Sequence, residues 1–395
     1  MTEREPEPES FWGRLRSRDL AASATTSGIM GLALGVAGVA LPLLAIRAGY
    51  SAAEIGALTA VSAVSQLVSR LSLGGLMKRV PEWTLISSAG FFLALSCGLV
   101  ALSPAVLPFV VAQLLQGVAR AFHWTSTTAH LVRAPGRAAP RLAVVNFTAA
   151  IGSLIGPVIA GVLSEQTPVL ALAVAAGISL VAIGPTFLLD RLPPFAPPED
   201  RPKGRVWRRP GVDVGCCAAV TAGGWQALLT SYVPVAMVAA GQNAATVGAL
   251  VSVANGAMLI GAGVAGRVRS RWQPPVVLGA ILVGGTAVAL TAALADSVPL
   301  SALVLAAGGY CAGTLQVLGS AVVAESVHPE ERGEAIAASG TFRALSMFGT
   351  PLAVAGLISL VPLAPAVAAV GVALGLPAVV LRRHARPRPP GARPD

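Results

Sequence analysis

Long apolar stretches alternate with short polar ones along nearly the whole chain. Twelve of the apolar stretches reach about 20 residues, the length that a helix needs to cross the hydrocarbon core of a bilayer. They cover residues 21–46, 52–76, 83–103, 105–128, 142–164, 168–189, 213–239, 244–266, 274–295, 298–324, 334–358 and 361–381. Their length and their lack of period-two alternation argue against strands. The pattern therefore predicts an all-α membrane protein with twelve transmembrane helices.

The first six stretches resemble the second six. The segment AAEIGALTAV at residues 52–61 reappears as AATVGALVSV at residues 244–253, and Pro42 recurs at the same offset as Pro234. We therefore expect two homologous six-helix halves, residues 21–189 and 213–381. Residues 190–212 are rich in proline and charge, so they cannot enter hydrocarbon and should form a linker. Residues 1–20 and 382–395 are the expected tails.

The basic residues fall almost entirely in alternate loops. Of the 28 Lys and Arg residues, 24 lie in the two tails, the linker and the even-numbered loops, whereas the odd-numbered loops hold only Arg47. Cytoplasmic loops of membrane proteins carry the excess of Lys and Arg. Both tails and the linker are therefore predicted to be cytosolic, and we expect a monomer in the plasma (inner) membrane.

Composition supports the membrane class and narrows the chemistry. Hydrophobic residues make up 54% and charged residues 12%, with a mean hydropathy of +0.73. The net charge of +10 does not indicate nucleic-acid binding, because the charges sit in short loops rather than on a basic helix face. The four cysteines lie in apolar segments without metal-ligand spacing, and no nucleotide-binding loop occurs. We expect no metal, no cofactor and no direct use of ATP.

A polar stripe marks one predicted helix. Gln113, Gln116, Arg120, His123 and Thr127 follow spacings of three and four, which places all five on one helix face. A helix that faces only lipid needs no such stripe. Further polar candidates lie in the seventh, tenth and eleventh stretches: Gln226, Tyr232, Tyr310, Thr314 and Arg343. We predict that these side chains line a substrate cavity; the alternative is hydrogen bonding between helices without a substrate.

The charged side chains in the interior of the predicted spans are all cations. Arg70, Arg120 and Arg343 lie well inside spans, whereas acidic residues such as Glu54 sit at helix ends. Arg343 is about 14 Å deep at 1.5 Å per helical residue, near the midplane. Its charge needs either backbone carbonyls or an anionic group of a substrate. A coupling proton is a further expected partner, and His123 is either its carrier or a structural residue.

Three local motifs resemble those of the major facilitator superfamily of transporters. Residues 74–81 are similar to its G-x-L-x-D-R-x-G gate motif: Gly74, Leu76 and Arg79 match, and Lys78 replaces the aspartate. Residues 328–335, HPEERGEA, are similar to the family's entrance to the eleventh helix.

The third motif lies in the fifth stretch. Gly152, Gly156, Pro157 and Gly161 resemble the pattern often seen in the family's antiporters. Glycines let helices approach closely and the proline bends the helix at a defined place. The same spacing is also common in ordinary membrane packing, so a role beyond packing stays one of two alternatives.

The resemblance covers essentially the whole chain and implies a secondary transporter that works by alternating access, with conformational roles for the gate motif and the fifth-stretch motif. We expect export of a small amphipathic organic compound. Uptake of an organic anion or a sugar-like solute is the alternative, and a transporter-like receptor or scaffold is the alternative from another class. An enzyme is not expected, because one histidine without a buried carboxylate supplies neither a nucleophile with its base nor a metal site.

Overall fold

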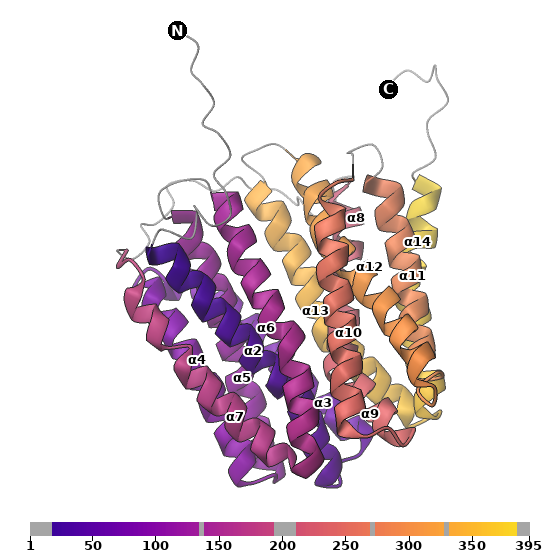
Figure 1. The fold of residues 1–395 in the computed structure, drawn as a ribbon. Helices are drawn as coiled ribbons and strands as arrows, with labels where there is room; N and C mark the ends of the chain where they lie inside the picture. Colours follow the sequence, from indigo (N-terminus) through magenta and orange to yellow (C-terminus); the bar gives the residue numbers. More distant parts are fainter. Residues whose placement is uncertain (1–17, 134–137, 193–210, 269–272, 328–331, 385–395) are drawn as a thin grey trace, which may run out of the picture. The chain divides into compact units, whose positions relative to one another are not determined.

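The structure, a computed structural model, describes residues 18–133, 138–192, 211–268, 273–327 and 332–384 (Figure 1). Within these residues every regular element is helical. The elements are α2 (Arg18–Arg47), α3 (Ala52–Leu76), α4 (Glu82–Leu102), α5 (Val106–Arg133), α6 (Ala138–Gln166), α7 (Pro168–Val181), η1 (Gly184–Leu188), α8 (Val212–Thr230), α9 (Tyr232–Ala239), α10 (Ala244–Ala265), α11 (Gln273–Thr291), α12 (Val298–Glu325), α13 (Arg332–Ile358) and α14 (Leu363–His384). Most of the predicted tails and linker, and residues 328–331 of the motif at 328–335, lie outside the described residues.

The predicted all-α membrane fold is confirmed. Each of the twelve predicted spans coincides with one helix or with two consecutive ones. In the described part of the chain, 11 helices are long and apolar enough to cross a membrane, and α14 adds a shorter apolar helix at Leu363–Val379. The chain is a multi-pass membrane protein.

The seventh span is broken into α8 and α9 at Ser231, whose φ of −121° and ψ of −72° are not helical. Pro234 explains the position of the break, because a proline ring clashes with the carbonyl four residues earlier, here that of Thr230. The hydroxyl of Ser231 donates to the carbonyl of Ala227 at 2.7 Å, which satisfies a group near the end of α8. Pro42, at the matching position of the first half, lies inside an unbroken α2.

The chain divides into two compact units. Unit 1 comprises residues 1–44 and 64–199, and unit 2 comprises residues 45–63 and 200–395. The division runs through α3, whose first twelve residues belong to unit 2. The predicted halves, residues 21–189 and 213–381, stay a prediction at their boundaries.

Unit 1 is held together by close helix contacts and by hydroxyl groups that donate to neighbouring helices. Added Cβ atoms at Gly31 and Gly152 would overlap Ala149 and Gly28, so the backbones of α2 and α6 nearly touch. Ser96 of α4 donates to the carbonyl of Ala112 on α5 at 2.8 Å. Small residues and interhelical hydrogen bonds are how membrane helices associate, because lipid removes the usual hydrophobic driving force.

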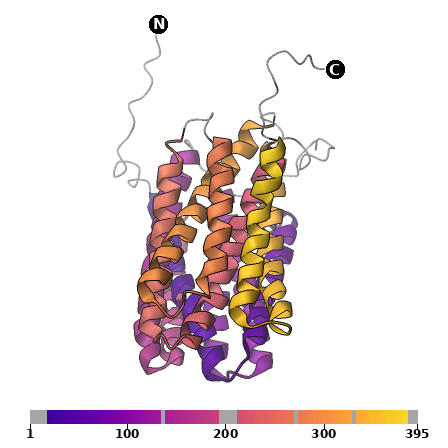
Figure 2. The same cartoon turned by 90° about the vertical axis from the view of Figure 1, so that its right-hand side faces the viewer.

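Unit 2 uses two such backbone contacts. Added Cβ atoms at Gly261 and Gly309 would overlap backbone atoms of the facing helix, which brings α10 and α12 together. Gly285 and Gly371 do the same for α11 and α14, which run side by side in Figures 1 and 2. Helix α8 contacts α11, α12 and α13. The predicted polar residues of unit 2 are distributed over α8, α9, α12 and α13.

Candidate functional site

The polar stripe on α5 lies on a buried face of the helix. Gln113 and Gln116 are 7% and 3% exposed, and His123 is 1% exposed. Thr127 is also buried, whereas Arg120, in the middle of the row, keeps an intermediate accessible surface. The five side chains therefore share a face that is removed from lipid, with the guanidinium-bearing residue as its most accessible member.

Several of these buried polar atoms have no hydrogen-bond partner within the described residues. They are Gln116 Nε2, His123 Nε2 and Thr127 Oγ1. The electrostatic neighbour of Arg120 is the thiol of Cys97 on α4, a weak hydrogen-bond acceptor. Arg70, on α3, has an unpartnered Nε as well. Unpaired donors at membrane depth are costly, so this row is the part of unit 1 that most needs a further partner.

The predicted residues of unit 2 have more complete environments. Tyr232 is 1% exposed, and its hydroxyl donates to the carbonyl of Pro351 on α13 at 3.3 Å. Thr314 is buried and donates to the carbonyl of Tyr310 on its own helix at 2.9 Å. Tyr310 itself is 39% exposed, and Gln226 on α8 is half-buried.

Arg343 belongs to the face of α13 that packs against α8. A Cβ atom at Gly223 of α8 would lie 2.6 Å from the Arg343 carbonyl oxygen, so the two backbones are close there. One turn further along, the hydroxyl of Ser346 donates to the carbonyl of Val220 at 2.7 Å. Ser339, Ser346 and Thr350, which share this face with Arg343 by their helical spacing, are all buried.

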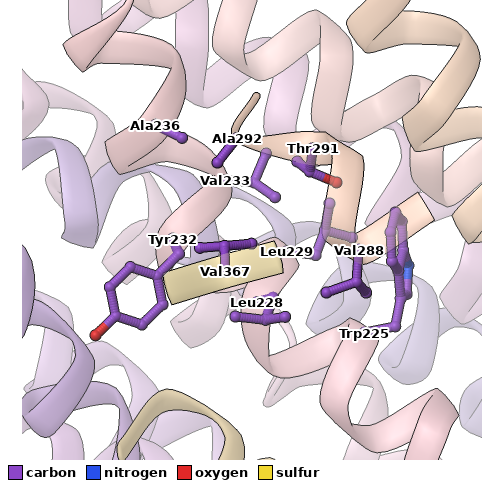
Figure 3. Close-up of a pocket in the computed structure, with 10 residues that line it drawn as sticks. All are labelled: Trp225, Leu228, Leu229, Tyr232, Val233, Ala236, Val288, Thr291, Ala292 and Val367. Atoms are coloured by element: carbon purple, nitrogen blue, oxygen red, sulfur yellow. The ribbon is translucent and has the colours of Figure 1, made fainter. Parts of the chain in front are cut away.

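A small apolar pocket lies inside unit 2 (Figure 3). Its lining residues come from α8, α9, α11 and α14, with Ala292 just after α11: Trp225, Leu228, Leu229, Tyr232, Val233, Ala236, Val288, Thr291, Ala292 and Val367. The Thr291 hydroxyl is used within its own helix, donating to Ala287, and the Tyr232 hydroxyl points away from the apolar side chains. Trp225 Nε1 has no partner among the described residues. The polar pattern of the sequence singled out only Tyr232 among these lining residues, because most of the others are ordinary apolar side chains.

The residues of the gate motif lie away from the stripe on α5. Lys78 and Arg79 are exposed after the end of α3. An added Cβ atom at Gly74 would meet nothing within 4 Å, and Leu76 packs on a buried cluster that includes Met77. The structure thus places this motif at the surface of unit 1 and makes none of its members part of the buried polar row.

The fifth-span motif is a contact surface. A Cβ atom at Gly156 would lie 2.6 Å from the carbonyl oxygen of Leu32, and one at Gly35 would lie 3.1 Å from the Cδ atom of Pro157. Gly152 meets the carbonyl of Gly28 even more closely, while Gly161 is buried further along α6. The motif therefore sets the distance between α6 and α2.

Sequence reasoning missed a buried ionic cluster at one end of unit 1. Asp19 is 5% exposed; its carboxylate lies 2.7 Å from His130 Nε2 and accepts from Arg141 at 2.7 Å. It also accepts from the backbone N–H of Asp190 at 3.0 Å. Asp19 lies in the first turn of α2 and His130 in the last turn of α5, and only the fold brings those two helix ends together.

A second ion pair, also missed, joins the start of α4 to the end of α5. Glu82 is 1% exposed and pairs with Arg133. Both clusters fix the ends of helices and neither includes Arg120. Among the described residues no group of His, Cys, Asp and Glu is arranged to hold a metal ion.

Comparison with known proteins bears on family and fold. A sequence model described as Major Facilitator Superfamily matches residues 24–351 and 214–395. A mutant form of the nucleoside transporter NupG superposes with a TM-score of 0.73 at 12% identity, covering 92% of this chain and 98% of its own. A bacterial homolog of the human lysosomal transporter Spinster, inward-facing and occupied, gives 0.73 at 13% identity, covering 95% and 99%. A search of curated proteins gives no match.

Proposed function

This chain belongs to the major facilitator superfamily of membrane transporters, and on that premise we propose that it exports a small amphipathic organic compound by alternating access. Its family makes it a transporter rather than an enzyme. Export is favoured by the fifth-span motif, whose residues Gly152, Gly156 and Pro157 resemble those of the family's antiporters.

The buried polar row of α5 carries the proposal. A membrane helix places Gln116 and His123 on a buried face, with Arg120 between them, only at a cost of several kcal/mol unless water or a ligand satisfies them. Unit 2 contributes an apolar pocket beside Trp225 and Tyr232, which suits a hydrophobic group.

Uptake of an organic anion is the second candidate. It is favoured by the arginines of the spans, Arg120 and Arg343, because a cation at membrane depth attracts anionic partners. We place the protein in the plasma membrane with both termini in the cytosol, on the strength of the basic loops. We propose that it acts as a monomer.

Growth phenotypes test the direction of transport. A knockout and an overexpressing strain are compared across a panel of toxic amphipathic compounds and across organic anions as sole carbon sources. Export predicts that the knockout becomes sensitive and the overexpressor resistant to one class of toxic compound. Loss of growth on an anion without any change in resistance would instead support uptake.

Vesicles containing the purified protein separate transport from a receptor or scaffold role. A compound identified by the growth panel is expected to accumulate in these vesicles when an ion gradient is imposed, and not in vesicles without protein. Failure to move any compound that changes growth would contradict the transport proposal and favour a receptor or scaffold.

A further inference from the structure

The unpartnered polar atoms of the protein are unevenly distributed. Within the described residues, α5 contains five side chains with a buried atom that finds no partner: Gln116, His123, Ser126, Thr127 and His130, whose other ring nitrogen bonds Asp19. The described helices of unit 2 that follow residue 211 contain only Trp225 and Ser252. Native proteins satisfy the large majority of buried polar atoms, so a concentration on one helix calls for an explanation.

The hydroxyl groups sharpen the point. In most helices of this chain a Ser or Thr hydroxyl donates to the carbonyl four residues earlier, as Thr128 does to Trp124 at 2.8 Å and Thr230 to Gln226 at 3.1 Å. This local bond is the default when nothing better is available. Ser126 and Thr127 do not use it although their neighbour Thr128 does. Neither hydroxyl has a partner among the described residues.

A second helix has the same property at matching levels. On α2, the hydroxyls of Ser23, Thr26 and Ser27 are buried without partners in the described structure. The ends of α2 and α5 are joined by the hydrogen bond between Asp19 and His130. Short loops join α2, α3, α4 and α5 in turn, so α2 and α5 run in opposite directions.

Counting from that bond at 1.5 Å per residue gives the levels of the two rows. Ser23 and Ser126 both lie about 6 Å from it, whereas Ser27 and His123 lie about 12 Å and about 10 Å away. The unpartnered polar residues of α2 and of α5 thus occupy similar depths in unit 1. The next polar residue of α5 beyond His123 is Arg120.

Arg120 is the charge at the inner end of these rows. Its electrostatic neighbour in the structure is the Cys97 thiol, and no acidic side chain of the described residues faces it. The acidic residues of unit 1 within the described ranges lie at helix ends or beyond them: Asp19, Glu82, Glu165 and Asp190. Asp19 and Glu82 are already paired with other cations. A guanidinium offers five donors and stays charged, so its natural complement is an anion with several acceptor oxygens.

We propose that unit 1 binds an anionic group of the transported compound at Arg120, with Gln116 and His123 one turn to either side completing the site. The ligand class is an organic anion, a carboxylate, sulfonate or phosphate group on an apolar body. The inference rests on the proposed transport function and narrows its substrate class. A neutral compound would meet the amide donor of Gln116 but leave the charge of Arg120 unbalanced, and a cation would be repelled.

Binding to the purified full-length protein tests the site. The probes share one ring system: 2-naphthalenesulfonate as the anion and 2-naphthalenesulfonamide as its uncharged counterpart, with inorganic sulfate as a third arm. Thermal unfolding midpoints measured over a concentration series give the apparent Kd of each probe. The variants are Arg120→Gln, Arg120→Lys and Gln116→Leu, and the matched control is Arg267→Gln, which removes one charge from an exposed position outside the site.

The wild type is expected to bind the sulfonate at least about tenfold more tightly than the sulfonamide. Arg120→Gln should remove that preference, Arg120→Lys should retain part of it, and Gln116→Leu should weaken sulfonate binding while the control stays unchanged. Should Arg120→Gln fail to fold, Arg120→Lys carries the test, because losing the planar fork must still weaken binding by several-fold. Tighter binding of the sulfonate than of sulfate supports an organic ligand rather than an inorganic ion.

Two results would overturn the anion site: equal affinities of the wild type for sulfonate and sulfonamide, or an anion preference that survives undiminished in a folded Arg120 variant. Sulfate binding without sulfonate binding would also overturn it. If the wild type and Arg120→Gln transport a neutral compound at equal rates, the anion site is wrong and the export proposal is retained. Conversely, Arg120-dependent anion binding without any transport would keep the site and remove the proposed function.

Discussion

At the scale of single residues, Arg343 offers a test of charge in unit 2. Its backbone packs against Gly223, which keeps α13 close to α8 whatever the side chain does. We expect Arg343→Gln to lower transport of the identified substrate to below about a tenth of the wild-type rate, and Arg343→Lys to lower it less, because lysine keeps the charge and loses only the planar fork. Initial uptake rates in vesicles, corrected for the amount of protein, provide the measurement.

The control for this prediction is again Arg267→Gln. Normal expression of Arg343→Gln together with a wild-type rate would show that the guanidinium has no role in recognition. A variant that fails to accumulate in the membrane would instead point to a structural role, in which backbone carbonyls satisfy the charge.

For the candidate site residues, the sequence predicted which helix face each one occupies, but not which atoms it contacts. The spacing of Gln116, Arg120 and His123 placed them on one face, because that follows from 3.6 residues per turn. Whether each atom finds a partner depends on helices remote in the chain. For the same reason Asp19 was not singled out, since its partners His130 and Arg141 are more than a hundred residues away.

At the scale of elements, the contact of α6 with α2 depends on the absence of side chains. A leucine at Gly156 would push its Cβ atom to 2.6 Å from the Leu32 carbonyl and 2.8 Å from the Cα atom of Gly35. The helices would have to separate. We expect Gly156→Leu to abolish transport while the protein still reaches the membrane, as measured by vesicle uptake and by the amount of protein in isolated membranes.

Gly177→Leu is the matched control, since Gly177 lies in α7 with nothing near its added Cβ atom. It adds the same side chain to a membrane helix and should leave transport close to wild type. If Gly156→Leu transports as well as Gly177→Leu, the close approach of α6 and α2 has no bearing on activity.

The positions of the helices along the chain were predictable, because the length of an apolar run and its flanking prolines determine where a membrane helix begins and ends. The break between α8 and α9 was not predicted. Pro42 and Pro234 occupy matching positions, yet only the second ends a helix. Before Pro234, Thr230 and Ser231 place hydroxyls on the carbonyls of the preceding turn, whereas the matching residues, Gly38 and Val39, have no hydroxyl.

At the scale of the whole molecule, the orientation in the membrane is open to direct test. The basic loops predict that Gln242, just after α9, faces outward and that Lys203, in the linker outside the described residues, faces the cytosol. Single cysteines at these positions are introduced into a background without the four native ones. We expect a membrane-impermeant maleimide to label position 242, and not position 203, in intact cells.

Permeabilised cells provide the control, because both positions should then react. Labelling of position 203 from outside in intact cells would contradict twelve spans with cytosolic termini. The two homologous halves stay a prediction from the sequence. The grouping of residues 45–63 with unit 2 was not, because it depends on tertiary contacts such as that of Gly56 with the Tyr232 side chain.

The contacts of the Asp19 carboxylate can form only in the order in which its partners are synthesised. It emerges from the ribosome with the first helix, whereas its backbone partner at Asp190 follows 171 residues later. At a synthesis rate of about 5–20 residues per second, that delay is roughly 10–30 s. Until His130 and Arg141 emerge, 111 and 122 residues after Asp19, hydration must hold its charge at the membrane surface. The amino-terminal unit therefore completes its assembly only after its last helix has been inserted, which exposes an unfinished unit to quality control for the whole of that time.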